Sequence, residues 1–220
     1  RRAAPFRMPV RWVNRPNLDF RGFSGQVCSG DVKPGDRVKI LPSGRESRVE
    51  RIVTYTGDLD EAVPGQSVTL TLADEVDCSR GDVIAEADNP PEVSDQFQVR
   101  VLWMSDRPLL PGRKYILKFG AKQVRATINA PKYAIDINTL GDEPARTLEL
   151  NEFGVTTISL DEPIAYDAYK DIREMGGFVI IDRLNFDTMG MGLIDFALRR
   201  ASNIHWQALD IDREALAEQK

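Results

Sequence analysis

An alternating hexapeptide, Ser67-Val68-Thr69-Leu70-Thr71-Leu72, follows the turn Val63-Pro64-Gly65. Residues two apart on a β-strand share a face, so this hexapeptide predicts a strand with its aliphatic side chains inward and its threonines outward. Similar runs, each next to a Gly- or Pro-containing turn, lie nearby at 37–41, 47–55 and 81–85. Roughly six short strands within about 90 residues indicate a small closed barrel, which leaves no free sheet edge.

The run 47–55 and the second half of the chain continue the β pattern. In 47–55, one face carries Val49, Val53 and Tyr55, with Arg51 interrupting it. The run 96–103 alternates with four large apolar side chains on one face: Phe97, Val99, Val101 and Trp103. Further strands are expected at 115–119, 124–128 and 154–160. The continuous apolar run 177–181 predicts a strand buried on both faces.

Helix is expected only in short pieces. Residues 165–173 fit one helical turn, and 140–150 fit an irregular excursion. Residues 210–220 combine high helix propensity with little apolar surface, which indicates a connecting tail.

A polar stretch with two prolines, Glu86-Ala87-Asp88-Asn89-Pro90-Pro91-Glu92, separates the two halves. It shows no hydrophobic period, and its double proline favours an extended connection of fixed length. We therefore predict an all-β chain of two consecutive β-barrel domains, residues 1–89 and 94–202, followed by a tail at 203–220.

The residues that most catalytic and nucleotide-binding sites need are missing. The single histidine, His205, stands close to the end of the sequence, and no second histidine is available for a typical zinc site. A P-loop does not occur, and no glycine is followed by lysine. The two cysteines, Cys28 and Cys78, have no partner at ligand spacing, so we expect free thiols in a reducing cytoplasm. We predict no catalytic, cofactor or metal site in these residues.

The charge of the chain is mildly acidic, with a net charge of −5 and a pI of about 5.1, which argues against nucleic-acid binding. No run approaches the roughly 20 apolar residues that span a membrane. The first 21 residues nevertheless hold six arginines against one acid, Asp19: Arg1, Arg2, Arg7, Arg11, Arg15 and Arg21. They form either a solvated strand face or a basic rim that meets another domain, a partner or a nucleotide.

Three ordered segments in the first half carry a family resemblance: Phe6-Arg7-Met8-Pro9-Val10, residues 22–30 (GFSGQVCSG) and Val32-Lys33-Pro34-Gly35-Asp36. Together they resemble the second domain of elongation-factor-type GTPases. Other segments resemble the large subunit of sulfate adenylyltransferase more than a translation factor: residues 12–16, 19–22, 53–62, 72–77, 108–113, 147–152 and 176–183. The resemblance covers residues 5 to about 207. One departure is Met191, which stands where the related third domains often have alanine.

The resemblance implies two β-barrels of the elongation-factor domain 2 and domain 3 types. It implies a non-catalytic part of a GTP-hydrolysing enzyme that joins ATP and sulfate into adenylylsulfate and pyrophosphate. GTP and Mg would bind a GTPase domain outside these residues, and a separate small subunit would carry the adenylyltransferase site. The segment 203–207 resembles the connection to an adenylylsulfate kinase domain, which adds a third expected neighbour. The alternative is a pair of translation-factor barrels that bind aminoacyl-tRNA.

We expect the docking residues at the basic end of the chain and at one strand end. Asn14, Arg15, Phe20 and Arg21 are polar, charged or aromatic residues of a strand-loop-strand segment, although a plain surface loop with one core aromatic explains them equally well. Arg183 follows the buried run 178–181 and is the candidate for an ion pair across the barrel interface; the alternative for it is an exposed charge at a strand end.

Overall fold

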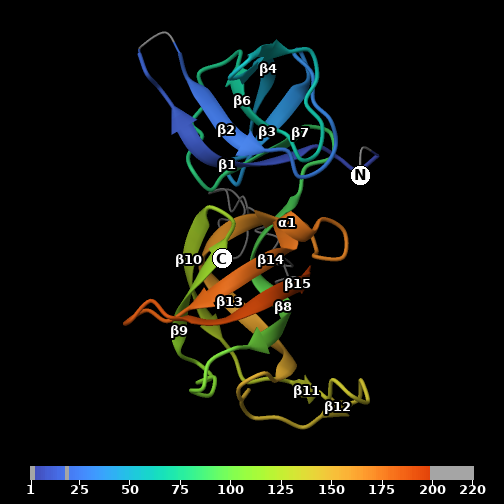
Figure 1. Cartoon of the computed structure of the whole chain (residues 1–220), viewed down its shortest axis with the longest axis vertical. Helices are drawn as coiled ribbons and strands as arrows, with labels where there is room; N and C mark the ends of the chain where they lie inside the picture. The colour runs from blue at the N-terminus through green and yellow to red at the C-terminus, as the bar shows by residue number, and fades with distance from the viewer. Residues whose placement is uncertain (1–2, 18–19, 199–220) are drawn as a thin grey trace, which may run out of the picture.

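The computed structural model describes residues 3–17 and 20–198, and the predicted tail at 203–220, with His205, lies outside them. Two β-barrels lie one above the other along the long axis of the molecule (Figure 1). A short connection, residues 87–91, joins the last strand of the first barrel to the first strand of the second. The two-barrel, all-β architecture predicted from the sequence is confirmed.

The first barrel is a seven-stranded antiparallel sheet in the order β3-β7-β1-β2-β6-β4-β5. Pairing between β3 and β4 closes it into a barrel, and β5 extends β4 as a short hairpin. The strands are β1 (Arg7–Asn14), β2 (Gly22–Gln26), β3 (Arg37–Leu41), β4 (Arg45–Thr54), β5 (Gly57–Leu59), β6 (Ser67–Leu72) and β7 (Val83–Glu86).

The second barrel is an eight-stranded sheet in the order β10-β9-β14-β15-β8-β13-β11-β12, closed by pairing between β10 and β13. Its strands are β8 (Glu92–Trp103), β9 (Lys114–Phe119), β10 (Lys122–Ile128), β11 (Tyr133–Ile135), β12 (Asp142–Glu143), β13 (Phe153–Tyr166), β14 (Gly177–Ile181) and β15 (Thr188–Ala197). The one helix among the described residues is α1 (Arg173–Gly176).

Each barrel has its own apolar core, formed by alternate residues of its strands. Strand β8 shows the rule most clearly, because its predicted inward residues are fully buried: Phe97, Val99, Val101 and Trp103. The Trp103 ring meets Tyr115 edge-on at 5.8 Å between centroids, and its indole N–H donates to the Arg107 carbonyl. The polar atom of this large core residue is therefore satisfied.

The prediction that Val49, Val53 and Tyr55 share one face of the strand is wrong beyond Val49. The pairing of β4 with β6 shifts register between Val49 and Arg51. After such a bulge, each following residue points to the face opposite to the one that simple alternation predicts. Ile52 is therefore the buried residue, whereas Val53 is only partly buried and Tyr55 is fully exposed.

The strand β14 is buried on one face only, contrary to the prediction for 177–181. Phe178 and Ile180 point into the core, whereas Val179 is 37% exposed. A strand in a closed barrel has one interior face, so the outward residues meet solvent unless another element covers them. The predicted helical turn also lies later than expected, because Ala165 and Tyr166 pair with β8 and complete β13.

The glycines around Met191 explain how its larger side chain is accommodated. Gly190 and Gly192 are the inward positions of β15, and a Cβ at Gly192 would lie 2.1 Å from the Phe178 ring. A Cβ at Gly190 would lie 2.4 Å from the Leu102 carbonyl oxygen. Met191 itself points outward and is 39% exposed, so it does not alter the core.

We expect Gly192→Ala to lower the free energy of unfolding by about 2 kcal/mol, because the new methyl group has to displace the buried Phe178 ring. Urea denaturation followed by circular dichroism measures the loss. Gly141→Ala is the matched control, since the nearest atom to its Cβ is a loop hydroxyl at 3.2 Å. Equal stability of the two variants would contradict the packing argument.

Candidate docking surfaces

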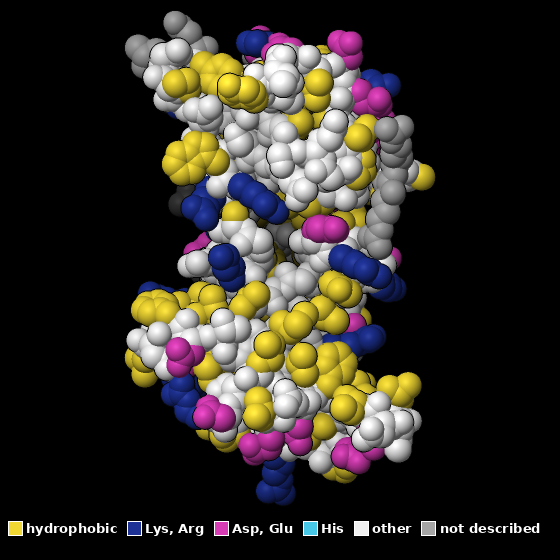
Figure 2. Space-filling model, viewed as in Figure 1, with side chains coloured by type: hydrophobic (Ala, Val, Ile, Leu, Met, Phe, Trp, Pro, Cys, Tyr) yellow, Lys and Arg dark blue, Asp and Glu magenta, His cyan; other side chains and the backbone are white. Residues whose placement is uncertain are grey.

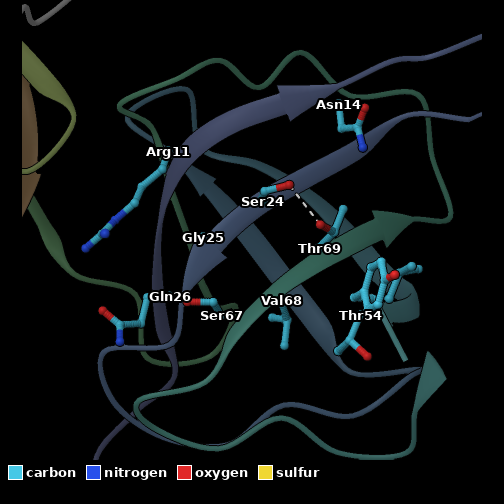
Figure 3. Close-up of a pocket in the computed structure, with 11 residues that line it drawn as sticks. Arg11, Asn14, Ser24, Gly25, Gln26, Thr54, Ser67, Val68 and Thr69 are labelled. Atoms are coloured by element: carbon cyan, nitrogen blue, oxygen red, sulfur yellow. Dashed lines mark hydrogen bonds between the residues drawn. The ribbon is translucent and has the colours of Figure 1, made fainter. Parts of the chain in front are cut away.

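A shallow groove crosses the outer side of the first barrel. Strands β1, β2, β6 and the end of β4 form it (Figure 3), and its volume is about 450 Å³. Its floor is low because the central side chains are small. Ser24 and Thr69 lie side by side there and share a hydrogen bond of 2.8 Å between their hydroxyls. The fully exposed Tyr55 stands at the β4 side.

The groove is lined by hydroxyl groups and one cation. Its hydroxyl groups donate and accept hydrogen bonds, and Arg11 adds a positive charge that forms no ion pair with a described residue. Its lining holds no pair of titratable groups placed for acid-base catalysis. The groove suits an extended polar segment of a partner better than a small reacting molecule.

A second hollow of about 480 Å³ opens beside the groove on the same barrel. Arg15, Phe20 and Arg21 line it, together with Glu50 and the loop 73–76. The Phe20 ring separates the hollow from the groove, because it packs over Gly22 beside Thr69. A Cβ at Gly22 would lie 2.8 Å from that ring and 2.4 Å from the Thr69 methyl group.

The structure brings four of the five predicted docking residues to one barrel. Asn14 lines the groove, and Arg15, Phe20 and Arg21 line the hollow. Arg21 also has a structural role, because its guanidinium lies 5.4 Å from the centre of the Phe23 ring and 3.8 Å from the Asp77 carboxylate. Docking through these residues stays a prediction.

Arg183 lies apart from the other four. It is exposed in the turn between β14 and β15, and it makes no ion pair with any residue in 3–17 or 20–198. The buried carboxylate next to it, Asp182, pairs with Arg113 at 2.8 Å. The ion pair expected across the barrel interface is formed by another arginine.

That arginine is Arg7, in the first strand of the first barrel. Its side chain is 2% exposed, and its Nε lies 2.8 Å from the Asp167 carboxylate of the second barrel. A second guanidinium nitrogen donates to the other Asp167 oxygen at 3.3 Å. The third donates to the carbonyls of Asn89 and Phe6, so one side chain ties together both barrels and their connection.

The basic cluster alone does not single out Arg7 as the junction residue. Arg7 stands between Phe6 and Met8, both of which are buried. Alternation alone would turn a strand residue between two inward neighbours to the solvent, so Arg7 is buried because the second barrel covers that face and supplies the Asp167 acceptor. The basic-rim interpretation therefore holds for Arg7, which faces the other barrel, whereas Arg11 and Arg15 are exposed.

An apolar contact accompanies the ion pair at the barrel junction. Leu41, Val83 and Ala85 of the first barrel form one buried cluster with Ile172 and Met175 of the second. Cys28 packs against this cluster. The junction thus combines a buried charge pair with a small core.

Both thiols lie in surroundings that disfavour the thiolate. Burial, with a smaller effect of the Glu174 charge, raises the pKa of Cys28 to about 11. Burial raises the pKa of Cys78 to about 12. Among the described residues no group of three or more His, Cys, Asp or Glu side chains is placed to hold a metal ion. The helix in this part of the chain is too short to cross a membrane.

Two family models match the chain in the order of its barrels. The elongation factor Tu domain 2 model matches residues 23–85, and the GTP-eEF1A C-terminal domain-like model matches residues 96–195. Sup35 complexed with GDP has the same fold, with a TM-score of 0.81 over 90% of this chain and 48% of that chain, at 18% identity. The class is therefore the tandem β-barrels of elongation-factor-like proteins.

Curated relatives give the narrower relationship. Sulfate adenylyltransferase subunit 1 of Aeromonas hydrophila is 44% identical over 97% of this chain. Bifunctional enzyme CysN/CysC of Xylella fastidiosa is 51% identical over 99%, and Bifunctional enzyme NodQ of Rhizobium sp. (strain N33) is 50% identical over 98%. The chain spans 49%, 35% and 33% of these relatives, respectively. This chain is a homologue of part of sulfate adenylyltransferase subunit 1, as its sequence predicted.

We expect Arg7→Ala to lower the free energy of unfolding by about 3 kcal/mol, because it leaves Asp167 without its cation at the barrel junction. Denaturant unfolding of the variant and of Arg51→Ala measures the difference. Arg51 pairs with Asp58 on the open surface of the same barrel, so its loss should change stability little. Equal losses would show that the junction pair is no stronger than a surface pair.

We expect the Cys28 thiol to react with iodoacetamide at pH 8 about a hundredfold more slowly in the folded chain than in urea. Its pKa of about 11 lies two units above the value of 9.0 for an exposed thiol, which leaves a hundredth of the usual thiolate. Mass spectrometry of the alkylated protein gives the two rates. A folded-state rate equal to the rate in urea would contradict the burial of this thiol.

Proposed function

We propose that this chain is the non-catalytic two-barrel part of the GTP-hydrolysing subunit of sulfate adenylyltransferase. The enzyme joins ATP and sulfate into adenylylsulfate and pyrophosphate in sulfate assimilation. The observation that carries the proposal is the 44% identity to a sulfate adenylyltransferase subunit 1 over 97% of the chain. Cytoplasmic location follows from the same proposal.

In this proposal the two chemical reactions occur outside these residues. A GTPase domain of the longer polypeptide binds GTP and Mg, and the small subunit carries the adenylyltransferase site. An adenylylsulfate kinase domain is a further neighbour, supported by the bifunctional relatives. The barrels dock these parts to one another and relay the state of the GTPase domain to the small subunit.

The junction supports the relay. Arg7, Asp167 and the apolar cluster hold the two barrels together, so a movement of one barrel is passed to the other. Coupling also requires that the free energy with which the barrels dock differ between the GTP-bound and the hydrolysed state of the GTPase domain. A contact of equal strength in both states would not shift the equilibrium between them. The groove and the hollow on the first barrel are the proposed contact points for that change.

The aminoacyl-tRNA alternative is not better supported than the sulfate adenylyltransferase proposal. The likeness to Sup35 at 18% identity concerns the fold alone, and the net charge of −5 disfavours a polyanionic partner. Tight, salt-sensitive tRNA retention in a filter-binding assay would restore this alternative.

The test uses the full-length protein together with the small subunit. We expect Arg7→Ala to leave GTP hydrolysis active while it lowers the adenylylsulfate formed per GTP hydrolysed at least threefold, because the barrels no longer move as one unit. Phosphate release and adenylylsulfate are measured in the same reaction.

Arg51→Ala is the matched control, because it removes an exposed arginine-carboxylate pair of the same barrel and should leave the ratio unchanged. A melting curve establishes that each variant is folded. An unchanged ratio in folded Arg7→Ala would contradict the relay. Absence of any adenylylsulfate formation by the wild-type pair of subunits would overturn the proposed function.

A further inference from the structure

The second barrel carries an apolar outer face that its own fold leaves uncovered. Six outward residues of four adjacent strands make up this outer apolar face: Leu102 (β8), Ile116 (β9), Val179 and Ile181 (β14), and Met191 and Leu193 (β15). Figure 2 shows hydrophobic side chains gathered on the lower lobe, over the β14 and β15 strands of Figure 1.

The register makes this face continuous. Val179 is the direct partner of Met191, which in turn is the partner of Leu102 on the other side. Ile181 lies opposite Ile116. Cross-strand partners are close enough for their side chains to touch, so these residues form one surface across four strands.

The fold itself does not account for these apolar residues. The core beneath is filled by their inward neighbours, such as Phe178 and Ile180. Outward strand positions on a solvated barrel are usually polar. Val179 and Met191 instead stay 37% and 39% exposed, side by side. The other four residues of the face are half-buried, and a contiguous, partly exposed apolar face of this kind is typical of a contact with another protein.

The border of the outer apolar face is cationic. Lys118 lies opposite Val179, and Arg125 lies opposite Ile116. Neither side chain forms an ion pair within the part of the chain that the structure describes, in contrast to Arg100, which pairs with Asp195 at 3.0 Å. A complementary surface is therefore apolar at its centre and carries carboxylates at its edge.

We infer that the outer apolar face is the docking site of a separate protein subunit whose surface is apolar with an acidic border. The inference rests on the proposed function, because it identifies that subunit with the small catalytic subunit. The face thus gives the second barrel a contact of its own, in addition to the groove on the first barrel.

Two other occupants fit the observations less well. In a symmetric contact between two copies, the face of the second copy would carry the same cationic border rather than the acidic border that complementarity requires. A domain tethered to this chain would be expected to make a more polar contact, because contacts between domains of one chain are more polar than permanent subunit contacts. An apolar centre is typical of permanent subunit contacts.

The test is the affinity of the full-length protein for the small subunit, measured by fluorescence anisotropy at two salt concentrations. Met191→Glu should raise the Kd at least tenfold, because it places a carboxylate in the apolar centre. Lys118→Glu should raise it about threefold and reduce its dependence on salt. Ile137→Glu, at an apolar position of the same barrel that is 69% exposed, is the matched control and should leave the Kd unchanged.

The outcomes separate this inference from the proposed function. If the wild-type subunits associate and neither Met191→Glu nor Lys118→Glu weakens the complex more than Ile137→Glu, the docking site is wrong while the proposed function stands. If the wild-type subunits do not associate, the proposed function fails as well.

A photo-crosslinking amino acid at position 191 identifies the occupant directly. Crosslinks to the small subunit support the inference. Crosslinks within the same polypeptide, or to a second copy of it, overturn it. Melting temperatures of the variants show that a loss of affinity is not a loss of folding.

Discussion

Arg7 belongs to the first strand of one barrel, yet its guanidinium is buried against a carboxylate of the other. A buried arginine requires this arrangement, because an unpaired charge at such a junction costs several kcal/mol. The ion pair therefore fixes the orientation of β1, the path of the connection at Asn89 and the end of β13 together. The apolar cluster around Met175 adds area to the junction, while the directional hydrogen bonds of Arg7 specify its geometry.

The two barrels present different chemistry to their surroundings. The first offers a groove with hydroxyl groups and an arginine, Arg11, that forms no ion pair with a described residue. The second offers an apolar sheet face with cations at its border, which we propose to be a docking site. A polar groove suits a contact that forms and breaks, and an apolar face suits a contact that persists. This division agrees with the proposed relay, in which one neighbour changes state while another stays bound.

Much of the fold could be predicted from local patterns, because alternation and turn residues determine strands directly. In strand β8 the residues from Phe97 to Trp103 followed this rule, whereas Val93 near the start of the strand is exposed. The bulge in β4 was not predictable, since a register shift depends on the partner strand. Arg7 was overlooked as the junction residue because its partner, Asp167, is 160 residues away. The exposure of Val179 depended on barrel closure, which the apolar run itself does not encode.

In strand β15 the alternation of Gly190, Met191 and Gly192 assigns core packing to the two glycines and the outer surface to the methionine. The two inward positions admit no side chain, because the Leu102 carbonyl oxygen and the Phe178 ring already occupy the space. The outward position between them is 39% exposed beside its cross-strand neighbours Val179 and Leu102, outside the core. Substitutions at 191 are thus insulated from folding, so selection can diversify this position among homologues and change which partner is recognised while the barrel stays the same.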